Sequence, residues 1–210
     1  MDQSSLVSLV PDEMEYRDAY RLLLSAVVPR PIAWVSTLAA DGTPNLAPFS
    51  FFNAVSGRPQ VVMVSVSPRS ARLGGGEKDT LRNVRATKEA VVHLVPETLA
   101  EVMNRTSAEW PPEVDEFSEA GLTPAPSVDV RPARVAEAPL ALETKLHQIV
   151  PVEDSGNTLV LLRVVRYHIR ADLLRDNGLI DASLLAPITR MGGPEYAHLG
   201  SVFSMERPRV

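Results

Sequence analysis

The stretch PRPIAWVSTLAADGTPNLAPFSFFN, residues 29–53, gives the strongest indication of the fold. Residues 32–38 suit a β-strand, residues 44–52 suit a second strand, and Asp41-Gly42 lies between them. An Asp-Gly pair between two such runs is typical of a hairpin, because glycine accepts the positive φ that tight turns require. We therefore expect an antiparallel hairpin here.

Short strands recur along the rest of the chain. We expect them over residues 60–66, 90–95, 140–150 and 158–170. The last is apolar on both faces over its middle, which is typical of a strand inside a sheet or barrel. The chain also contains 18 prolines, against about ten at the usual frequency, and proline favours turns and strand ends over long helices.

The remaining segments suggest peripheral elements. A helix is expected over residues 13–26, where Asp12 and Glu15 resemble a capping pair. A short helix should follow Asp79 as its cap, and Pro96 should open another. These features predict one domain over residues 1–210, mainly β with peripheral helices.

Two further segments are expected to be irregular. The acidic, proline-rich residues 109–129 are expected to form an insertion or a lid-like excursion. Residues 172–210 should form a tail of loops with a short helix.

Composition excludes several classes of protein. The formal net charge of -5 argues against a nonspecific nucleic-acid binder, which needs a basic surface. With 0 cysteines there are no disulfides, thiolate metal sites or cysteine nucleophiles. The chain has neither a basic secretory signal at its start nor a membrane-length apolar run, so we expect a cytoplasmic protein with no membrane partner.

The stretch SPRSARLGGGEKDTLRN, residues 67–83, has the composition of a phosphate site. Arg69, Arg72 and Lys78 supply positive charge, and Thr80 offers a hydroxyl at a helix start, where free amides attract anions. It is not a P-loop, because Asp79 follows Lys78 where Ser or Thr is required. The alternative is a solvated basic loop with Asp79 as an ordinary helix cap.

Small polar residues mark the first hairpin as a second candidate binding region. Small side chains on strands let a flat ligand approach the backbone, whose amides and carbonyls can bind its edge. The alternative is that these are ordinary strand residues and that Trp34 is core. The small polar residues are Ser36, Thr37, Asn45, Ser50 and Asn53.

Other catalytic patterns are absent from the sequence. The four histidines show no metal-ligand spacing, and there is no G-x-S-x-G hydrolase elbow and no G-x-G-x-x-G dinucleotide fingerprint. His93 and His168 are expected in or beside sheet packing. The acids Glu113, Asp115, Glu116 and Glu119 are interpreted as a solvated face. We therefore predict no metal site and name no catalytic residue.

Five segments, taken in order, resemble the flavin reductase-like family, whose fold is the FMN-binding split β-barrel and which includes flavoredoxins. They are residues 29–56, residues 61–84, DEFSEAGLTPAPS at 115–127, APLALETKL at 138–146 and RMGGPEY at 190–196. Many relatives carry cysteine in the segment matching ALETKL, where this chain has Thr144. A role that depends on that thiol does not transfer.

The resemblance implies a homodimer with FMN near the subunit interface. By position, the residues along the isoalloxazine and ribityl chain would be Thr37, Asn45, Ala47 and Ser50. Those around the ribityl chain and phosphate would be Ser65, Lys78, Asp79 and Thr80. Arg190 and Tyr196 would approach the flavin from the tail.

Three functions are compatible with that family. The first is an NAD(P)H:flavin oxidoreductase, with NADH or NADPH as donor and a monooxygenase as partner. The second is an electron carrier of flavoredoxin type, and the third is an FMN-dependent oxidase or reductase of a small organic substrate. The same fold hosts unrelated functions, so the family alone does not choose between them.

Overall fold

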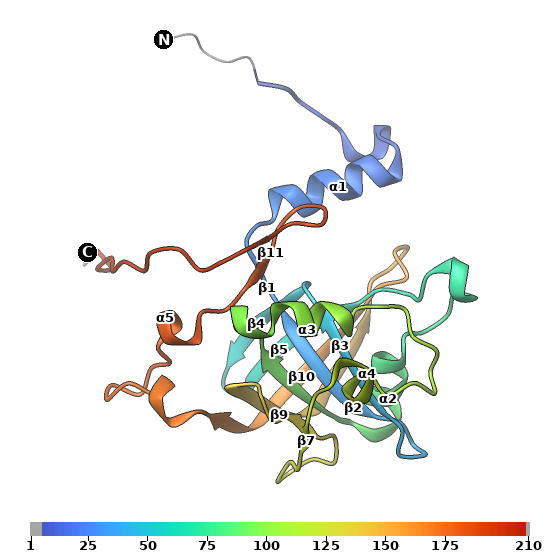
Figure 1. Ribbon diagram of the computed structural model, residues 1–210. Coiled ribbons are helices and arrows are strands. Elements are labelled where there is room, and N and C mark those ends of the chain that lie inside the picture. Colours follow the sequence, from blue (N-terminus) through green and yellow to red (C-terminus); the bar gives the residue numbers. More distant parts are fainter. Residues whose placement is uncertain (1–5, 209–210) are drawn as a thin grey trace.

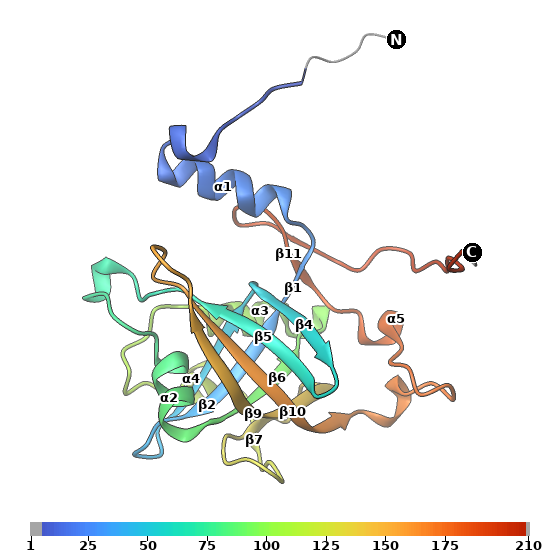
Figure 2. The same cartoon turned by 180° about the vertical axis from the view of Figure 1, so that it is seen from behind.

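The computed structural model describes residues 6–208 and contains one seven-stranded antiparallel sheet that curls into a barrel (Figures 1 and 2). The strand order across it is β3-β2-β6-β9-β10-β5-β4. The strands are β2 (Ala33–Leu38), β3 (Pro44–Phe49), β4 (Phe52–Gly57), β5 (Gln60–Val66), β6 (Glu89–Leu94), β9 (Leu140–Pro151) and β10 (Thr158–Ile169). The prediction of a mainly β protein with peripheral helices is confirmed.

The two edges of this sheet are joined by only two residues. Strand β3 ends at Phe49 and β4 begins at Phe52, and these are the two edge strands. The sheet must therefore curl until its edges approach each other. Ser50 and Phe51 cross the gap, and the Phe51 carbonyl accepts a hydrogen bond of 2.8 Å from the Ser65 amide. We call residues 48–51 the seam.

The prediction of one strand over residues 44–52 is therefore wrong. The chain leaves one edge at Phe49 and starts β4 on the opposite edge, paired with β5. The hairpin of β2 and β3, by contrast, is confirmed, with Thr37 opposite Asn45. Local turn chemistry sets the hairpin, whereas the crossing depends on closure of the whole sheet.

Alternating residues of the strands supply two large apolar cores and a small cluster of Val91, Val130 and Ala141. Inside the barrel, Val35, Val64, Val92 and Leu162 are almost fully buried. On the outer face of β2, Trp34 is completely buried and packs in a second core with Met103 and Phe117. Its indole Nε1 donates to Thr106 Oγ1 at 2.9 Å, so the interpretation of Trp34 as core is confirmed.

Two peripheral helices cover this outer core, α3 (Ala100–Arg105), preceded by a 3₁₀ turn at Glu97–Leu99, and α4 (Glu116–Ala120). Helix α2 (Asp79–Thr87) instead packs Leu81 and Val84 into the core inside the barrel. The segment 109–129 thus contains a helix, and it ends in β7 (Pro124–Ala125), which pairs with β8 (Arg134–Val135). Asp115 caps α4 by accepting from the Phe117 amide at 2.9 Å.

Helix α1 (Tyr16–Ala26) stands away from the barrel and buries none of its residues (Figure 1). The expected start at residue 13 and the capping pair are wrong. Asp12 lies in a 3₁₀ turn at Pro11–Glu13, Met14 is extended, and Glu15 caps the helix with no side-chain hydrogen bond. Pro11 begins this separate turn. The amides of Glu13 and Met14 donate to the carbonyls of Val10 and Pro11, which closes the turn before the helix begins.

The C-terminal segment returns to the start of the barrel. After a 3₁₀ turn at Ala171–Leu173 and α5 (Ala182–Leu185), strand β11 (Thr189–Arg190) pairs with β1 (Arg30–Pro31) and with β12 (Tyr196–Ala197). The short helix and loops predicted for this tail are confirmed. Its pairing with β1 gives no local signal in the sequence.

Two of the polar side chains buried on the sheet are ionisable. Glu143 is fully buried, because residues 128 and 129 cover it and donate their backbone amides to its carboxylate. His93 is also fully buried, as predicted. Its Nδ1 faces the Trp34 carbonyl at 2.8 Å, and its Nε2 accepts from the Val135 amide at 3.0 Å.

These two bonds require the neutral imidazole, because a protonated Nε2 would face the Val135 N–H. Burial lowers the pKa of His93 to about 4 from the ordinary 6.5. Between these two pH values His93 is protonated in the unfolded chain and neutral in the folded chain. The free energy of unfolding therefore falls as the pH is lowered. We expect His93 to contribute about 3 kcal/mol to the free energy of unfolding above pH 6.5 that is lost by pH 4.

Urea unfolding of the wild type and of His93→Gln across this pH range checks the prediction. The variant should be less stable at neutral pH and should lose less stability on acidification, because its amide does not titrate. Parallel pH profiles for the two proteins would contradict it.

Candidate functional site

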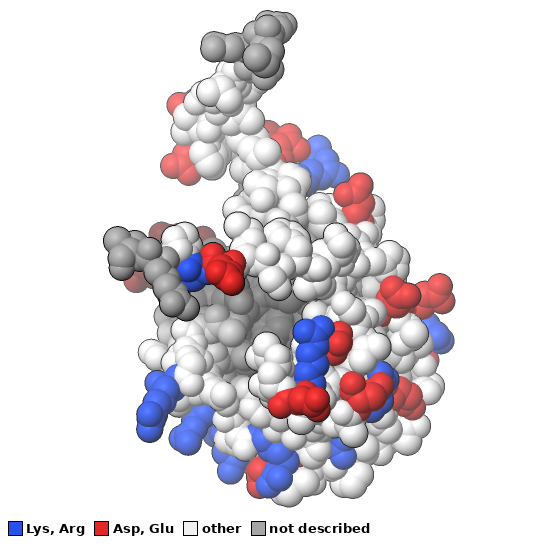
Figure 3. Space-filling view, turned by 90° about the vertical axis from the view of Figure 1, so that its left-hand side faces the viewer, with Lys and Arg blue, Asp and Glu red and all other residues white. Residues whose placement is uncertain are grey.

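Two adjoining cavities open at the seam. Cavity 1 has a volume of about 380 Å³ and cavity 2 about 170 Å³. Pro48, Phe49, Lys78 and Ser107 line both, so the cavities share a wall. Figure 3 shows the surface hollowed between the N-terminal segment and the barrel.

The first turn of α2 forms one side of cavity 2. Asp79 and Thr80 line it, and Lys78 occupies the N-cap position with no side-chain hydrogen bond to the helix. The prediction of Asp79 as the cap is therefore wrong, because Asp79 is already helical and its carboxylate pairs with Arg69 and Arg82. An uncapped first turn presents unpaired amides and the positive end of the helix dipole.

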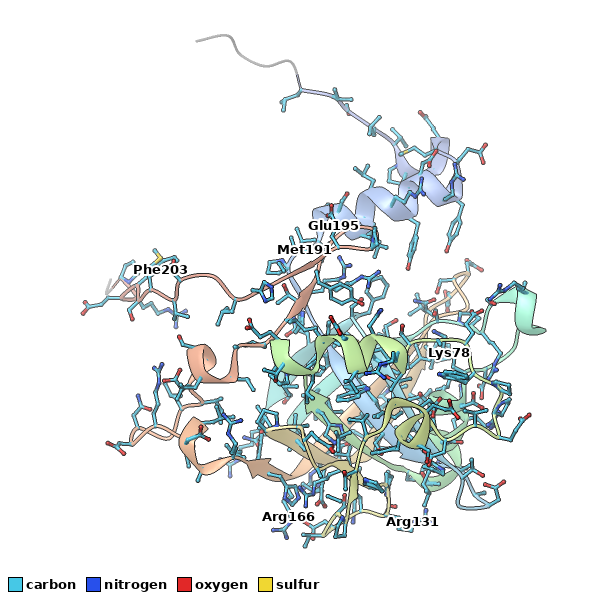
Figure 4. The ribbon with its side chains drawn as sticks, viewed as in Figure 1. Lys78, Arg131, Arg166, Met191, Glu195 and Phe203 are labelled. Atoms are coloured by element: carbon cyan, nitrogen blue, oxygen red, sulfur yellow. The ribbon has the colours of Figure 1, made fainter. Side chains whose placement is uncertain are left out.

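Lys78 is the cation common to both cavities. Its Nζ lies 5.7 Å from the centroid of the Phe49 ring, and burial lowers its pKa. Figure 4 shows Lys78 on the flank of the barrel, below α1. Arg69 and Arg82 pair with the Asp79 carboxylate of the same turn and neutralise its charge.

A buried polar network fixes the wall of cavity 2. Asn45 Nδ2 donates to Glu116 Oε1 at 2.9 Å, while its Oδ1 accepts from Thr80 Oγ1 at 2.9 Å and from Thr37 Oγ1 at 3.2 Å. Asn83 Nδ2 donates to Thr37 at 3.1 Å. Glu116, Thr80 and Thr37 therefore hold the Asn45 amide in one orientation.

Glu116 anchors this network from the segment 109–129. It is only 7% exposed, and its second oxygen accepts from the Leu46 amide at 3.0 Å. Burial raises its pKa. The interpretation of Glu116 as part of a solvated face is wrong, because α4 turns it onto β3 whereas Glu113 and Glu119 remain exposed.

The structure brings the predicted site residues together, with one exception. Ser50, Ser65, Arg190 and Tyr196 line cavity 1, Asn45, Ala47, Asp79 and Thr80 line cavity 2, and Lys78 lines both. Thr37 lines neither and is fully buried, where it supports Asn45. Thr80 donates its hydroxyl inward to Asn45, which leaves its amide rather than its hydroxyl for a ligand.

Sequence reasoning missed three contributors. Trp110 lines cavity 2, and its Nε1 is buried without an acceptor within residues 6–208. Arg30 and Tyr20 line cavity 1 from the N-terminal segment. An aromatic residue at the start of the acidic segment was an available signal for Trp110, whereas nothing local distinguishes Arg30. The described part of the chain holds no group of three acids or histidines suited to a metal.

Comparison with known proteins identifies relatives over almost the whole chain. The model of the flavin reductase like domain matches residues 24–184. Nitrilotriacetate monooxygenase component B from Bacillus cereus is 36% identical, with a TM-score of 0.91 over 97% of this chain and 100% of that one. The 2-nitrobenzoate 2-nitroreductase of Pseudomonas fluorescens is 27% identical, with a TM-score of 0.85 over 96% of each chain.

A third structure bears on the fold alone. It is described as a candidate flavin reductase with a split barrel domain, from Shewanella frigidimarina. It is 20% identical, with a TM-score of 0.82 over 94% of this chain and 96% of that one. The predicted split barrel is therefore confirmed.

The buried network generates a test of stability. In Glu116→Gln the new amide cannot accept from both the Leu46 N–H and Asn45, so one buried donor loses its partner. We expect a loss of about 1–3 kcal/mol in the free energy of unfolding, measured by urea titration. Glu119→Gln, on the exposed side of the same helix, should change it by less than about 0.5 kcal/mol. Equal effects of the two substitutions would contradict the assigned network.

Proposed function

Because the chain belongs to the flavin reductase like domain family, we propose that it binds FMN and is an oxidoreductase that uses NADH or NADPH as electron donor. The observation that carries the proposal is the uncapped, cationic first turn of α2 at the wall of two joined cavities. An anionic tail and a flat ring require two such adjoining sites.

The residues of cavity 2 fit the phosphate and ribityl chain. The first-turn amides of α2 and the Lys78 ammonium would hold the phosphate, since helix N-termini bind anions. Asp79 does not oppose it, because Arg69 and Arg82 neutralise its charge. The buried Trp110 Nε1, which lacks an acceptor, is a donor available to the same tail.

The residues of cavity 1 fit the ring. The small side chains of Ser50 and Ser65 allow a flat group to approach the seam, with Phe49 and Phe51 as apolar neighbours. FMN, when bound, supplies the ring that accepts hydride from a nicotinamide. The residues of cavity 1 would hold the two rings together and exclude water, and Lys78, which lines this cavity, would supply positive charge beside them.

We also propose a homodimer, in the cytoplasm. Tyr16 is 81% exposed, Leu23 53% and Val27 54%, so α1 presents an apolar face that nothing in residues 6–208 covers. Such a face is typical of a subunit interface. A second copy of the chain would extend the wall of cavity 1, which Tyr16 lines.

The relatives favour two roles for the reduced flavin. The likeness to nitrilotriacetate monooxygenase component B favours supply of reduced flavin to a partner monooxygenase. The likeness to 2-nitrobenzoate 2-nitroreductase favours a second candidate, direct reduction of a small organic substrate at the same site.

FMN titration tests the phosphate site. Lys78→Ala should weaken FMN binding by about 1–3 kcal/mol, or about fivefold to 150-fold in Kd, because it removes a charge-assisted contact. Lys145→Ala removes an exposed lysine from β9 and should leave the Kd unchanged. If both variants bind FMN as the wild type does, Lys78 does not contact the phosphate.

Anaerobic mixing tests the reaction. The FMN-loaded protein should lose its visible flavin absorbance after addition of NADH or NADPH, and the faster of the two identifies the donor. A protein that dithionite reduces but neither nicotinamide reduces would contradict the reductase function and favour an electron carrier.

A further inference from the structure

Two arginines face each other across a strand pair at the edge of cavity 1. Arg30 in β1 is the direct cross-strand partner of Arg190 in β11, and both line the cavity. Like charges placed opposite each other destabilise a sheet. No acidic residue lines cavity 1 among the described residues, and within residues 6–208 neither arginine forms an ion pair.

Arg30 is a buried, fixed cation. It is only 5% exposed, and its guanidinium donates to the carbonyls of Leu24 and Val27 at the end of α1 and of Met191 in the tail. Figure 4 places Met191 beside Glu195, at the hairpin beneath α1. The Nε of Arg30 has no acceptor within the described residues. Carbonyl dipoles alone therefore balance this charge.

Arg190 is the adjustable member of the pair. Its guanidinium lies 4.5 Å from the centroid of the Tyr196 ring, and Nη2 donates to the Gly193 carbonyl at 2.7 Å. The other N–H groups of this planar fork remain for a ligand. Tyr16 and Tyr20 stack with centroids 6.0 Å apart and line the same cavity, so aromatic faces adjoin the cations.

We propose that this corner of cavity 1, the arginine pair, binds the anionic group of a planar second substrate. The inference rests on the proposed function, in which FMN occupies the seam and its phosphate lies at α2. The arginine pair is separate from that phosphate site, because Arg30 and Arg190 line cavity 1 and the first turn of α2 lines cavity 2. The anion is a carboxylate on an aromatic ring or a phosphate of the nicotinamide nucleotide.

Equilibrium binding to the FMN-loaded full chain tests the arginine pair. The probes are benzoate, NAD⁺ and NADP⁺, which leave the flavin oxidised and report their binding by a shift in its visible absorbance. Arg190→Gln keeps a polar side chain but removes the charge, and should raise the Kd of at least one probe about fivefold to twentyfold. Arg190→Lys should retain part of the affinity.

Two controls separate this effect from others. Arg163→Gln removes an exposed arginine on β10 that lines neither cavity and should change no Kd. The Kd of FMN is measured for Arg190→Gln as well, so that every probe is titrated into protein that is saturated with the flavin.

The outcomes are distinct. A loss for benzoate identifies an aromatic acid as the ligand, and a loss for NAD⁺ or NADP⁺ identifies the nucleotide phosphate. If FMN binds and every probe binds Arg190→Gln as it binds the wild type, the arginine pair is not an anion site. A change only in oligomeric state would assign Arg190 to a subunit contact and also overturns the inference. Failure of the wild type to bind FMN overturns the proposed function and this inference together.

Discussion

The two-residue crossing at Ser50 and Phe51 is the constraint on which the rest of the structure depends. Because β3 and β4 are opposite edges of one sheet and only two residues join them, the sheet has to curl until those edges approach. An antiparallel sheet that closes in this way leaves a seam rather than a continuous ladder. The candidate site lies at this seam, since both cavities are lined by Pro48 and Phe49.

The site combines fixed polar groups with cationic side chains. Glu116, Thr37 and Thr80 hold Asn45 in one orientation, so the wall of cavity 2 is rigid before any ligand binds. Positive charge lies at two places: Lys78 at the start of α2 lines both cavities, whereas the arginine pair lines cavity 1 alone. This separation is why we assign one anion to the flavin and the other to its reaction partner.

Features with local causes could be predicted from the sequence, and features that depend on closure could not. The Asp-Gly turn predicts the first hairpin, and strand β5 matches its predicted bounds. Strand β4 was missed because its apolar residues continue those of β3 without a turn signal. Glu116 and the exposed Glu119 lie in the same short acidic segment, so the neighbouring sequence does not distinguish them. Only the docking of α4 on β3 buries Glu116. The guanidinium of Arg30 is held by hydrogen bonds to backbone carbonyls of two segments, and one of these carbonyls, in Met191, is 161 residues away in the sequence.

A crystal structure of the full chain grown with FMN tests the central claim most directly. We expect flavin density with its phosphate on the first-turn amides of α2 beside Lys78 and its ring against residues 48–51. Density for the flavin outside both cavities, or a phosphate held away from α2, would contradict it.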